Sequence, residues 1–597
     1  MCGIAGILTP DAPPDRAVLA RMLSAQRHRG PDGEGAVVSG PLGLGAVRLA
    51  VLDRTAAASQ PMTTRSGRFT LAYNGEVYNW RELRRELEGQ GLSFRSSGDT
   101  EMVLQALGHW GEAALERFDG VFALAFWDDR ERRLVLARDR IGVRPLYWAE
   151  AGRDLLFASE IKGILASGRV RPSVDGPALA ELFRFQNVWS QRTLFSGVLP
   201  VPPGAVLSWK DGRRTLRNGW RFDFPGGGTE TEAGAVDALR GLLAGAVSRQ
   251  LASDVPLGCA LSGGLDGAAL AAEAKAGLPE LDTFTVGFGT AGAARPGERA
   301  VDERGAARAV SAFLGTRHHE VEVGAMEALD GLPALVRHLE EPRLAASFQN
   351  LAGARLARRH VTVVFSGGGG DEVFAGYPWR YAPILGCRDV EAFAKAFSGV
   401  WSRVLAPGEE GGFWTAEGLR LVGQGDPEGV LRGLAAEAGD VPPLHRALSV
   451  EARTFLPAYC VLEDKLHMAA GAEVRVPLMD WALVDWARKL PEPLRLGPDG
   501  GGKRLLRAAL AGRLPAETLQ APKRGFVPPL LSWAGDPAWM GKLRGILLDP
   551  RTTGRGWIRP EALARDLDAL GVGSAAPLQR VWTCLAFETW CREFLEG

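Results

Sequence analysis

Two patterns of hydrophobic positions divide the chain. In its first third, short apolar runs such as residues 118–128 are bounded by Gly and Asp, which predicts buried strands connected by turns. One stretch differs, because Trp80, Leu83 and Leu87 recur at helical spacing and precede Gly89, which predicts a helix with a glycine stop. The first third therefore reads as one unit of short strands and turns that includes a helix.

The pattern changes in the second third. Residues 206–234 are rich in Pro, Gly and charge, and the glycine run 226–228 is the best linker candidate. Beyond it, long Ala- and Leu-rich helical patterns alternate with short strands such as residues 283–288, which predicts a parallel sheet covered by helices. We therefore predict two domains, over residues 1–205 and 235–597, joined by a linker.

The bulk composition excludes several classes of protein. A chain of 597 residues is too long for one hydrophobic core, and its balance of hydrophobic and charged residues is ordinary globular composition. The 70 basic and 70 acidic residues cancel, so no overall field draws nucleic acid or anionic lipid. We find no signal-peptide pattern and no apolar stretch of about 20 residues. We therefore expect a cytoplasmic protein without nucleic-acid or membrane partners.

The cysteines and histidines form no metal-binding pattern. The six cysteines include no CxxC pair or Cys/His zinc spacing, and His28, His318 and His319 have no ligand spacing either. We expect structural roles for these histidines.

The N-terminal residues can form a nucleophile. If Met1 is removed, Cys2 carries a thiol and a free α-amine on the same carbon. An α-amine has a pKa near ~8, so its neutral fraction can act as a base at pH 7, and the thiolate is a strong nucleophile. The alternative interpretation of Cys2 is a buried small hydrophobic residue, which is the usual role of a lone cysteine.

Four further segments favour the nucleophile. In chain order they are residues 27–35 (RHRGPDGEG), 47–53 (VRLAVLD), 73–79 (YNGEVYN) and 96–101 (SSGDTE). Together with the opening MCGIAGI, they resemble the glutaminase domain of the class II glutamine amidotransferases. The resemblance covers about the first third of the chain. It implies glutamine as a substrate and the α+β N-terminal-nucleophile fold, in which two sheets are stacked between helices (αββα).

The resemblance also implies roles for individual residues. Arg48 is expected to bind the α-carboxylate of glutamine with its planar fork, and Glu76 and Asp99 to hold its α-ammonium. The Asn74 side chain and the Gly75 backbone N–H are expected to form the oxyanion hole, because glycine permits close backbone approach.

A glycine-rich turn follows an apolar strand in the second half of the chain. The run PLGCAL leads into Ser262-Gly263-Gly264-Leu265-Asp266 and then into an alanine-rich helix, so backbone N–H groups and the helix dipole form an anion cradle. No Gly-Lys-Ser/Thr follows, so this is not a Walker A motif. The loop resembles the SGGxDS loop of the N-type ATP pyrophosphatases, which cut ATP between its α and β phosphates. The ATP contacts that it implies are Leu261, Ser262, Gly263, Gly264 and Asp266.

A second glycine-rich loop lies further along the chain. The segment VVFSGGGGDEVFAGY resembles the SGEGxDE segment of the asparagine synthetases, which implies that Ser366 and Gly367 lie beside the nucleotide. Asp266 and Asp371 are then placed to share Mg²⁺, a hard cation that prefers carboxylate and phosphate oxygens. Val286 is expected to pack on the adenine.

Three later segments continue the match in family order. Residues 463–480 are similar to the family's helix with its E-x-R-x-P turn, and residues 522–533 to its PKxGF segment. Lys503 matches the lysine that neutralises charge on the departing pyrophosphate, a role that suits an ammonium. Nearly the whole chain thus resembles the glutamine-hydrolysing asparagine synthetases, which implies an α/β parallel-sheet ATP pyrophosphatase domain after the glutaminase domain.

Two glycines depart from the family pattern. Gly267 stands where the pyrophosphate loop usually has a serine, so one hydroxyl contact to phosphate is missing. Gly368 stands where asparagine synthetases have the glutamate needed to form aspartyl-adenylate, and glycine supplies neither its charge nor its reach. Relatives that act on other carboxylates also differ here, so the acceptor is either aspartate or a specialised biosynthetic carboxylate.

These observations favour one function and leave two alternatives. The leading hypothesis is an enzyme that adenylates a carboxylate with ATP and amidates it with ammonia from glutamine. The alternatives are a ligase that uses a substrate's own amine and carries a vestigial glutaminase domain, and a non-catalytic homologue that binds nucleotide or glutamine. The intact glutaminase motifs argue against the first alternative, whereas Gly267 and Gly368 motivate the second. A homodimer is one option for the assembly.

Overall fold

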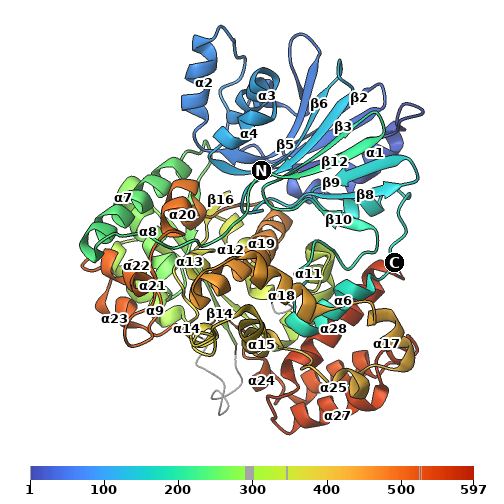
Figure 1. Cartoon of the computed structure of the whole chain (residues 1–597), viewed down its shortest axis with the longest axis vertical. Helices are drawn as coiled ribbons and strands as arrows, with labels where there is room; N and C mark the ends of the chain where they lie inside the picture. The colour runs from blue at the N-terminus through green and yellow to red at the C-terminus, as the bar shows by residue number, and fades with distance from the viewer. Residues whose placement is uncertain (1, 290–301, 344–346, 524, 526, 597) are drawn as a thin grey trace.

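The computed structural model describes residues 2–289, 302–343, 347–523, 525 and 527–596. Figure 1 shows two regions, a β-rich region that contains the N-terminus and a larger, mostly helical region that ends at the C-terminus.

The β-rich region consists of two stacked antiparallel sheets. In spatial order, the first sheet contains β10 (Val198–Pro200), β8 (Tyr147–Ala151), β9 (Asp154–Ala158), β1 (Cys2–Leu8), β3 (Leu42–Arg48) and β2 (Gly33–Ser39). The second contains β12 (Arg213–Asn218), β11 (Ala205–Lys210), β7 (Arg133–Arg138), β6 (Gly120–Asp128), β5 (Phe69–Val77) and β4 (Met62–Thr63).

Alternation along the strands builds this stack. In β1, Ile4 and Leu8 pack between the two sheets, whereas Ala5 and Ile7 belong to a core that includes the helix α1 (Arg16–Ser24). The helices α2 (Trp80–Gly89) and α3 (Asp99–Trp110) share a core with the second sheet on its far side. The layers are helix, sheet, sheet and helix, so the predicted αββα N-terminal-nucleophile fold is confirmed.

Residues 205–218 extend the second sheet. The strands β11 and β12 pair with each other, and β11 also pairs with β7. This hairpin lies within residues 206–234, which we expected to be a linker. Residues 206–218 belong to the sheet instead, because β11 buries Val206, Leu207 and Trp209 against it. Residues 219–231 contain neither helix nor strand, and the division into two domains remains a prediction.

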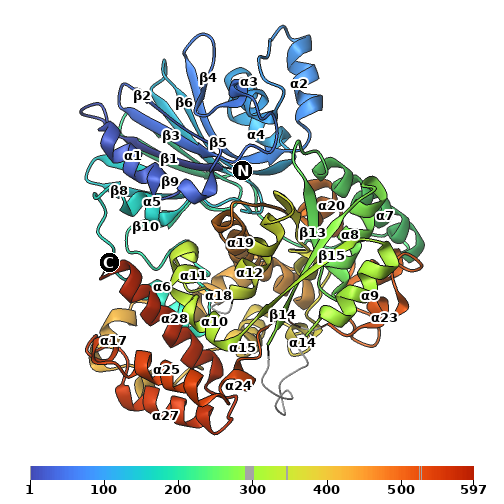
Figure 2. The ribbon, with the colours of Figure 1, turned by 180° about the vertical axis from the view of Figure 1, so that it is seen from behind.

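The helical region surrounds a five-stranded parallel sheet, as the strand–helix alternation predicted. In spatial order its strands are β15 (Arg317–Val323), β14 (Asp282–Phe288), β13 (Leu257–Ala260), β16 (Val363–Phe365) and β17 (Glu473–Arg475). Every neighbouring pair is parallel. The helices α9 (Arg304–Leu314) and α12 (Phe348–Arg358) cover opposite faces of the sheet (Figure 2).

The strand order changes direction at the centre of this sheet. From β13 the chain moves to β14 on one side, whereas β16 and β17 lie on the other side. The carboxyl ends of strands at such a switch point enclose a crevice that commonly binds ligands. The loops that follow β13 and β16 are the two glycine loops of the sequence, so the fold brings them to one place.

Most of the remaining chain is helical. The longer helices are α6 (Gly176–Phe185), α7 (Glu232–Gln250), α8 (Leu265–Gly277), α11 (Leu332–Leu339), α15 (Val390–Trp401), α17 (Ala416–Val422), α18 (Pro427–Glu437), α19 (Pro443–Ala469), α20 (Trp481–Ala487), α25 (Pro537–Leu547), α27 (Pro560–Gly571) and α28 (Leu578–Phe594). None of the helices in the described ranges combines the length and the apolarity that a membrane span requires.

Buried charges join the two regions. Arg29 donates to Glu160 (2.9 Å) within the β-rich region and to Asp464 (2.7 Å) on α19, and Arg144 donates to the other oxygen of Asp464 (3.0 Å). The side chains of all four residues are fully buried. Arg29 also donates to the backbone carbonyl of Cys2 (3.0 Å). This interface ion cluster (Arg29, Arg144, Glu160 and Asp464) therefore ties the first strand to a helix of the other region.

Replacing Asp464 by asparagine removes the charge that Arg29 and Arg144 share. An uncompensated buried charge costs about 3–5 kcal/mol, so we expect a clearly lower urea midpoint of unfolding, measured by circular dichroism. The matched control is Arg85→Ala, which removes an exposed ion pair with Glu82 and should leave the midpoint unchanged. Equal midpoints for the two variants would contradict the structural importance of the cluster.

Candidate functional site

The first site centres on Cys2 at the start of β1. Its side chain is buried, and its backbone nitrogen donates to Asn74 Oδ1 (3.0 Å) on β5. Gln60 Nε2 lies 3.6 Å from Cys2 Sγ. Burial raises the pKa of the Cys2 thiol, so the thiol stays protonated at neutral pH until a base removes its proton. Met1, whose removal we expect, lies outside the described residues.

Asn74 presents an unused donor beside this thiol. Its side chain is fully buried, its oxygen accepts from Cys2, and its Nδ2 has no hydrogen-bond partner within the described part of the chain. Buried amides are normally paired, so an unpaired one suits a ligand or a transient charge. The oxyanion hole stays a prediction, and Asn74 Nδ2 is the side-chain donor that it would use.

Position 75 requires a glycine because two strands approach closely there. A Cβ at this position would lie 2.6 Å from the Phe122 Cα on β6, and closer still to the Val121 carbonyl oxygen. The close approach that the sequence led us to expect is therefore between β5 and β6, two neighbouring strands of the second sheet.

Two buried carboxylates lie on the same part of the site. Asp99 begins α3 and accepts from the Tyr73 hydroxyl (2.8 Å) and the Val77 N–H (3.0 Å). Glu76 lies on β5, and its Oε1 is 3.6 Å from the Arg475 guanidinium. Burial raises the pKa of both carboxyls, and the Asp99 charge raises that of Glu76 further. A buried cation such as an ammonium would stabilise their ionised forms.

Arg48 is held at the rim by backbone oxygens. It lies opposite Cys2 in the β1–β3 pairing, and its guanidinium donates to the carbonyls of Leu52 (3.2 Å), Asp53 and Thr55 (3.2 Å). Neutral acceptors leave its charge uncompensated, which suits an anionic ligand.

The sequence missed the partners that hold this site. Gln60 contacts Cys2 Sγ and accepts from the Tyr73 N–H (2.6 Å), and Arg475 reaches Glu76 from β17 in the other region. Gln60 stands outside any motif that we singled out. Arg475 belongs to the E-x-R-x-P turn, but only the fold shows that this turn meets the first site.

The second site is formed by the two glycine loops that follow β13 and β16. In the first loop, Leu261 is buried and Ser262 Oγ accepts from the Gly264 N–H (3.1 Å), just before α8 begins. A Cβ on Gly263 would lie 2.5 Å from the Ala306 Cβ, and one on Gly267 3.0 Å from the Ala260 carbonyl oxygen. Little room exists for side chains here, which leaves the backbone as the surface of the loop.

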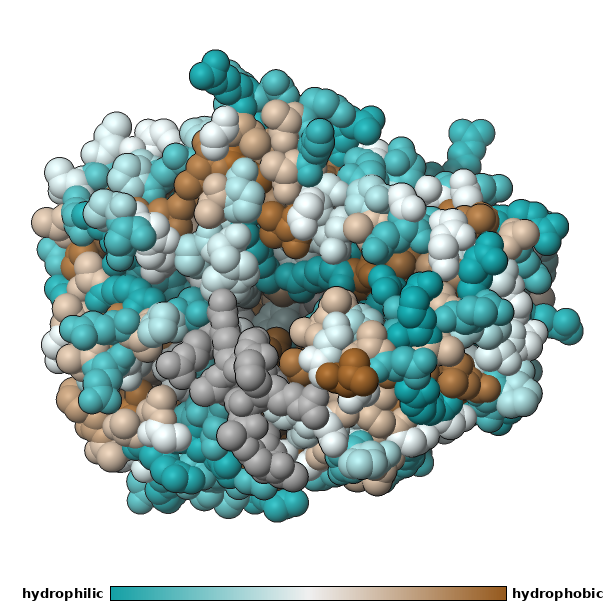
Figure 3. All heavy atoms as spheres, turned by 90° about the horizontal axis from the view of Figure 1, so that it is seen from below, coloured by the Kyte–Doolittle hydropathy of each residue, from teal (hydrophilic) through white to brown (hydrophobic). Residues whose placement is uncertain are grey.

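The second loop packs directly on the first. A Cβ on Gly367 would lie 2.8 Å from the Asp266 Cβ. The Ser366 hydroxyl donates to both carboxylate oxygens of Glu463 (2.7 and 2.9 Å) on α19. Val286, near the end of β14, is buried. Figure 3 views the molecule from below and shows a hollow near the middle of that face.

Two lysines and two aspartates form a charged centre beside these loops. Lys503 Nζ contacts both Asp266 and Asp371 (2.5 Å to Asp371 Oδ1), and Lys523 Nζ contacts the other oxygen of Asp371 (2.5 Å). Burial raises the pKa of Asp266, whereas the two lysines lower that of Asp371. A buried oxygen of Asp266, Oδ1, has no hydrogen-bond partner among the described residues. A paired carboxylate set with a free oxygen fits a hard cation such as Mg²⁺.

Lys523 is a residue that the sequence analysis did not single out. It belongs to the PKxGF segment, of which residues 524 and 526 lie outside the described residues. The sequence contains Lys523 within a recognisable motif, but it does not indicate that Asp371 is its partner.

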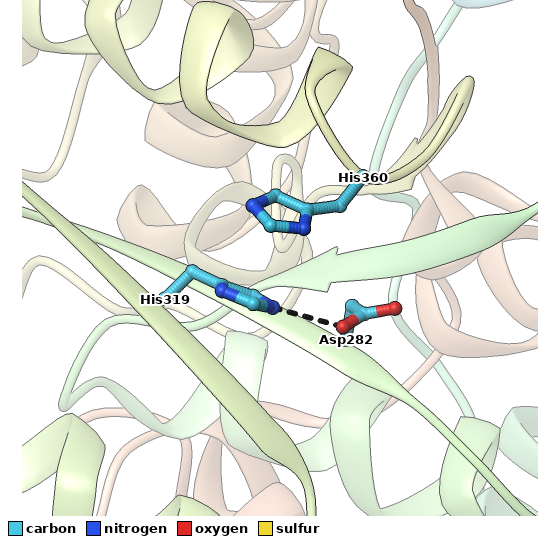
Figure 4. A group of neighbouring side chains, drawn as sticks. All are labelled: Asp282, His319 and His360. Atoms are coloured by element: carbon cyan, nitrogen blue, oxygen red, sulfur yellow. Dashed lines mark hydrogen bonds and ion pairs between the residues drawn. The ribbon is translucent and has the colours of Figure 1, made fainter.

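A third group of titratable residues lies at the edge of the parallel sheet (Figure 4). His319 on β15 hydrogen-bonds Asp282 on β14 (2.9 Å), and its ring stacks on His360 with 3.8 Å between centroids. Arg317 donates to both oxygens of Asp282 (3.1 and 2.9 Å). Both oxygens of the only carboxylate in this group already accept hydrogen bonds from Arg317, unlike Oδ1 of Asp266, which disfavours a metal ion there.

The fold and the two sites define a class of protein: an N-terminal-nucleophile fold with a buried cysteine at the start of its first strand, joined to a region built on a parallel sheet with two glycine loops. A family model described as a glutamine amidotransferase domain matches residues 1–220, and one described as asparagine synthase matches residues 238–592. The chain belongs to the asparagine synthase family.

Several relatives are similar along their whole length. Asparagine synthetase [glutamine-hydrolyzing] 1 of Bacillus subtilis (strain 168) is 29% identical, over 99% of this chain and 96% of that protein. A putative asparagine synthetase [glutamine-hydrolyzing] of Mycobacterium tuberculosis (strain ATCC 25618 / H37Rv) is 32% identical, over 100% of this chain and 98% of that protein.

Gly75→Ala tests the strand approach that positions Asn74. The added methyl group would overlap the backbone of β6, so β5 and β6 must move apart, and we expect a lower midpoint of thermal unfolding. The control is Gly33→Ala in β2, where a Cβ meets no atom within 4 Å. A midpoint for Gly75→Ala as high as that of the control would show that the sheet tolerates a side chain there.

Proposed function

We propose that this protein is a glutamine-hydrolysing amidotransferase that adenylates a carboxylate with ATP and converts it to an amide. The observation that carries the proposal is the buried, unpaired amide nitrogen of Asn74 beside Cys2, in a chain whose other half holds the Asp266, Asp371 and Lys503 centre. Membership of the asparagine synthase family supports both halves.

In the first half-reaction, removal of Met1 turns the Cys2 nitrogen into an α-amine. The amine already lies against Asn74 Oδ1, and in its neutral form it takes the thiol proton. The thiolate then attacks the side-chain amide carbon of glutamine. The oxyanion forms beside Asn74 Nδ2 and the Gly75 N–H. When it collapses, the C–N bond breaks, the α-ammonium of Cys2 returns the proton to the departing nitrogen, and ammonia leaves. Water then hydrolyses the thioester, which releases glutamate and restores the Cys2 thiol.

Glutamine is held by charge at its other end. The Arg48 fork binds the α-carboxylate, and Glu76 and Asp99 bind the α-ammonium. Burial raises the pKa of the Glu76 and Asp99 carboxyls, and the ammonium of bound glutamine lowers it again. Both carboxyls therefore stay ionised while glutamine is bound.

In the second half-reaction, an acceptor carboxylate attacks the α phosphorus of ATP and pyrophosphate leaves. The backbone of the Ser262–Gly264 turn and the start of α8 face the phosphates. Lys503 and Lys523 neutralise the negative charge of the departing pyrophosphate. Asp266 and Asp371 would hold Mg²⁺, which supplies a Lewis acid that polarises phosphate oxygens.

The amide then forms when ammonia from the first site attacks the acyl carbon and AMP leaves. The acceptor is aspartate or another biosynthetic carboxylate. Both choices remain because Gly368 stands at the position where the asparagine synthetases have a glutamate.

Cys2→Ala separates the two half-reactions. Without the thiol, glutamine cannot be opened, so we expect no AMP or amide with glutamine as nitrogen donor. Ammonium chloride should restore both products, because the second site does not use Cys2. Loss of activity with both nitrogen sources would mean that Cys2 is structural.

Lys503→Ala removes one cation from the second site. We expect AMP formation to fall about 10²–10³-fold, as for other losses of a group that stabilises developing charge. Glutamate release from glutamine, measured in the same samples, serves as the control and should largely persist. Unchanged AMP formation would remove Lys503 from the mechanism.

A further inference from the structure

We propose that Glu463 is the catalytic base of the acceptor site, supplied by α19 in place of the side chain that Gly368 lacks. This inference rests on the proposed amidotransferase function and assigns the group that takes the proton from the attacking nitrogen.

The Glu463 carboxylate fills the space next to Gly368. A Cβ built on Gly368 would lie 2.8 Å from Glu463 Oε2, 3.3 Å from the Tyr459 ring and 3.6 Å from Ser366 Oγ. A longer side chain at position 368 would enter the volume that the carboxylate now occupies. The loop after β16 therefore gains from a neighbouring helix the acidic group that its own sequence lacks.

Two hydroxyl groups hold this carboxylate in place. Ser366 Oγ donates to both of its oxygens, and the Tyr459 hydroxyl, one turn earlier on α19, donates to Oε1 (3.1 Å). The Gly368 N–H in turn donates to Ser366 Oγ (3.2 Å). Both acidic oxygens are thus oriented toward the loop by residues of the second site.

The environment of Glu463 suits a proton acceptor more than a structural residue. It is buried, and no cationic side chain of the described residues pairs with it. Burial raises the pKa of Glu463 to about 7, while the two hydroxyl donors oppose that shift. A buried carboxylate without a cationic partner destabilises the fold, so a hydrophobic residue at position 463 would pack better. A base with a pKa near the working pH is the most effective proton acceptor.

The loop between Ser366 and Gly370 connects Glu463 to the nucleotide centre. A Cβ on Gly370 would lie 2.5 Å from Asp266 Oδ1, and one on Gly367 would lie 2.8 Å from the Asp266 Cβ. Glu463 is thus on one side of this short loop, and the Asp266–Lys503 pair is on the other. An acyl-adenylate bound there would present its acyl carbon near the carboxylate.

The amide-forming step then balances as follows. The lone pair of ammonia forms the new C–N bond, and the bond between the acyl carbon and the AMP oxygen breaks. AMP leaves with that electron pair, and the proton that the nitrogen sheds passes to a carboxylate oxygen of Glu463.

Glu463→Gln tests the assignment because it keeps the shape and removes the basic oxygen. ATP–pyrophosphate exchange reports adenylation, and amide formation with ammonium chloride reports the second step without glutamine. The acceptor is whichever of L-aspartate, L-glutamate, succinate and benzoate supports the fastest exchange by the unaltered enzyme. We expect exchange within about twofold of normal and amide formation lowered by about 10²–10⁴-fold, the range for loss of a general base.

A matched control is Glu181→Gln. Glu181 is also buried with a raised pKa, but it accepts from the Trp189 and Ser190 N–H groups away from the loop. This variant should change both rates equally or not at all. If Glu463→Gln formed amide within twofold of the normal rate, the assignment of Glu463 would be wrong. The proposed function would still stand in that case, provided that the unaltered enzyme catalysed ATP–pyrophosphate exchange. Failure of the unaltered enzyme to exchange with any of the acids would contradict both.

Moving the carboxylate gives a second test. Gly368 does not have a positive φ, so its backbone accepts a glutamate. Gly368→Glu alone places two acidic groups in one space and should be impaired. Gly368→Glu combined with Glu463→Ala should form amide at least ten times faster than Glu463→Ala alone. A double variant no faster than Glu463→Ala would show that this space needs no carboxylate.

Discussion

The buried guanidinium of Arg29 is the contact on which the arrangement of the two sites depends. It donates at once to the Cys2 carbonyl, to Glu160 and to Asp464. A fully buried cation is tolerated only when its partners stay in place, so the strand that carries the thiol is fixed relative to α19.

The helix α19 extends this constraint to the second site. Asp464 faces the β-rich region through Arg29, whereas its neighbour Glu463 faces the loop that starts at Ser366. Arg475 lies on β17, which β16 separates from β13, and it contacts Glu76 in the Cys2 site. One helix and one short strand thus contact residues of both candidate sites, which links the positions of the two sites.

Local signals in the sequence predicted much of this structure. The spacing of Trp80, Leu83 and Leu87 predicted the helix α2, because one buried face repeats every turn, and Gly89 is its last residue. The two glycine loops could be placed at strand ends because glycine is required where backbones approach closely. The motif residues Cys2 and Asn74 are in direct contact, as a shared site requires.

Contacts between distant segments left no such signal. Gln60, Lys523, Glu463 and Asp464 have roles that depend on partners tens or hundreds of residues away, and nothing in their own neighbourhoods identifies those partners. The hairpin of β11 and β12 was hidden for a related reason: its polar, exposed edge strand has the composition of a linker.

The most direct test of the account is the fate of the glutamine amide nitrogen. The enzyme would be supplied with ATP, the acceptor carboxylate, glutamine labelled with ¹⁵N at its side-chain amide, and an excess of unlabelled ammonium. If one chain makes and uses the ammonia, mass spectrometry should find ¹⁵N in most of the amide product, in step with AMP. Product that carries nitrogen from the unlabelled pool would contradict the coupling of the two sites.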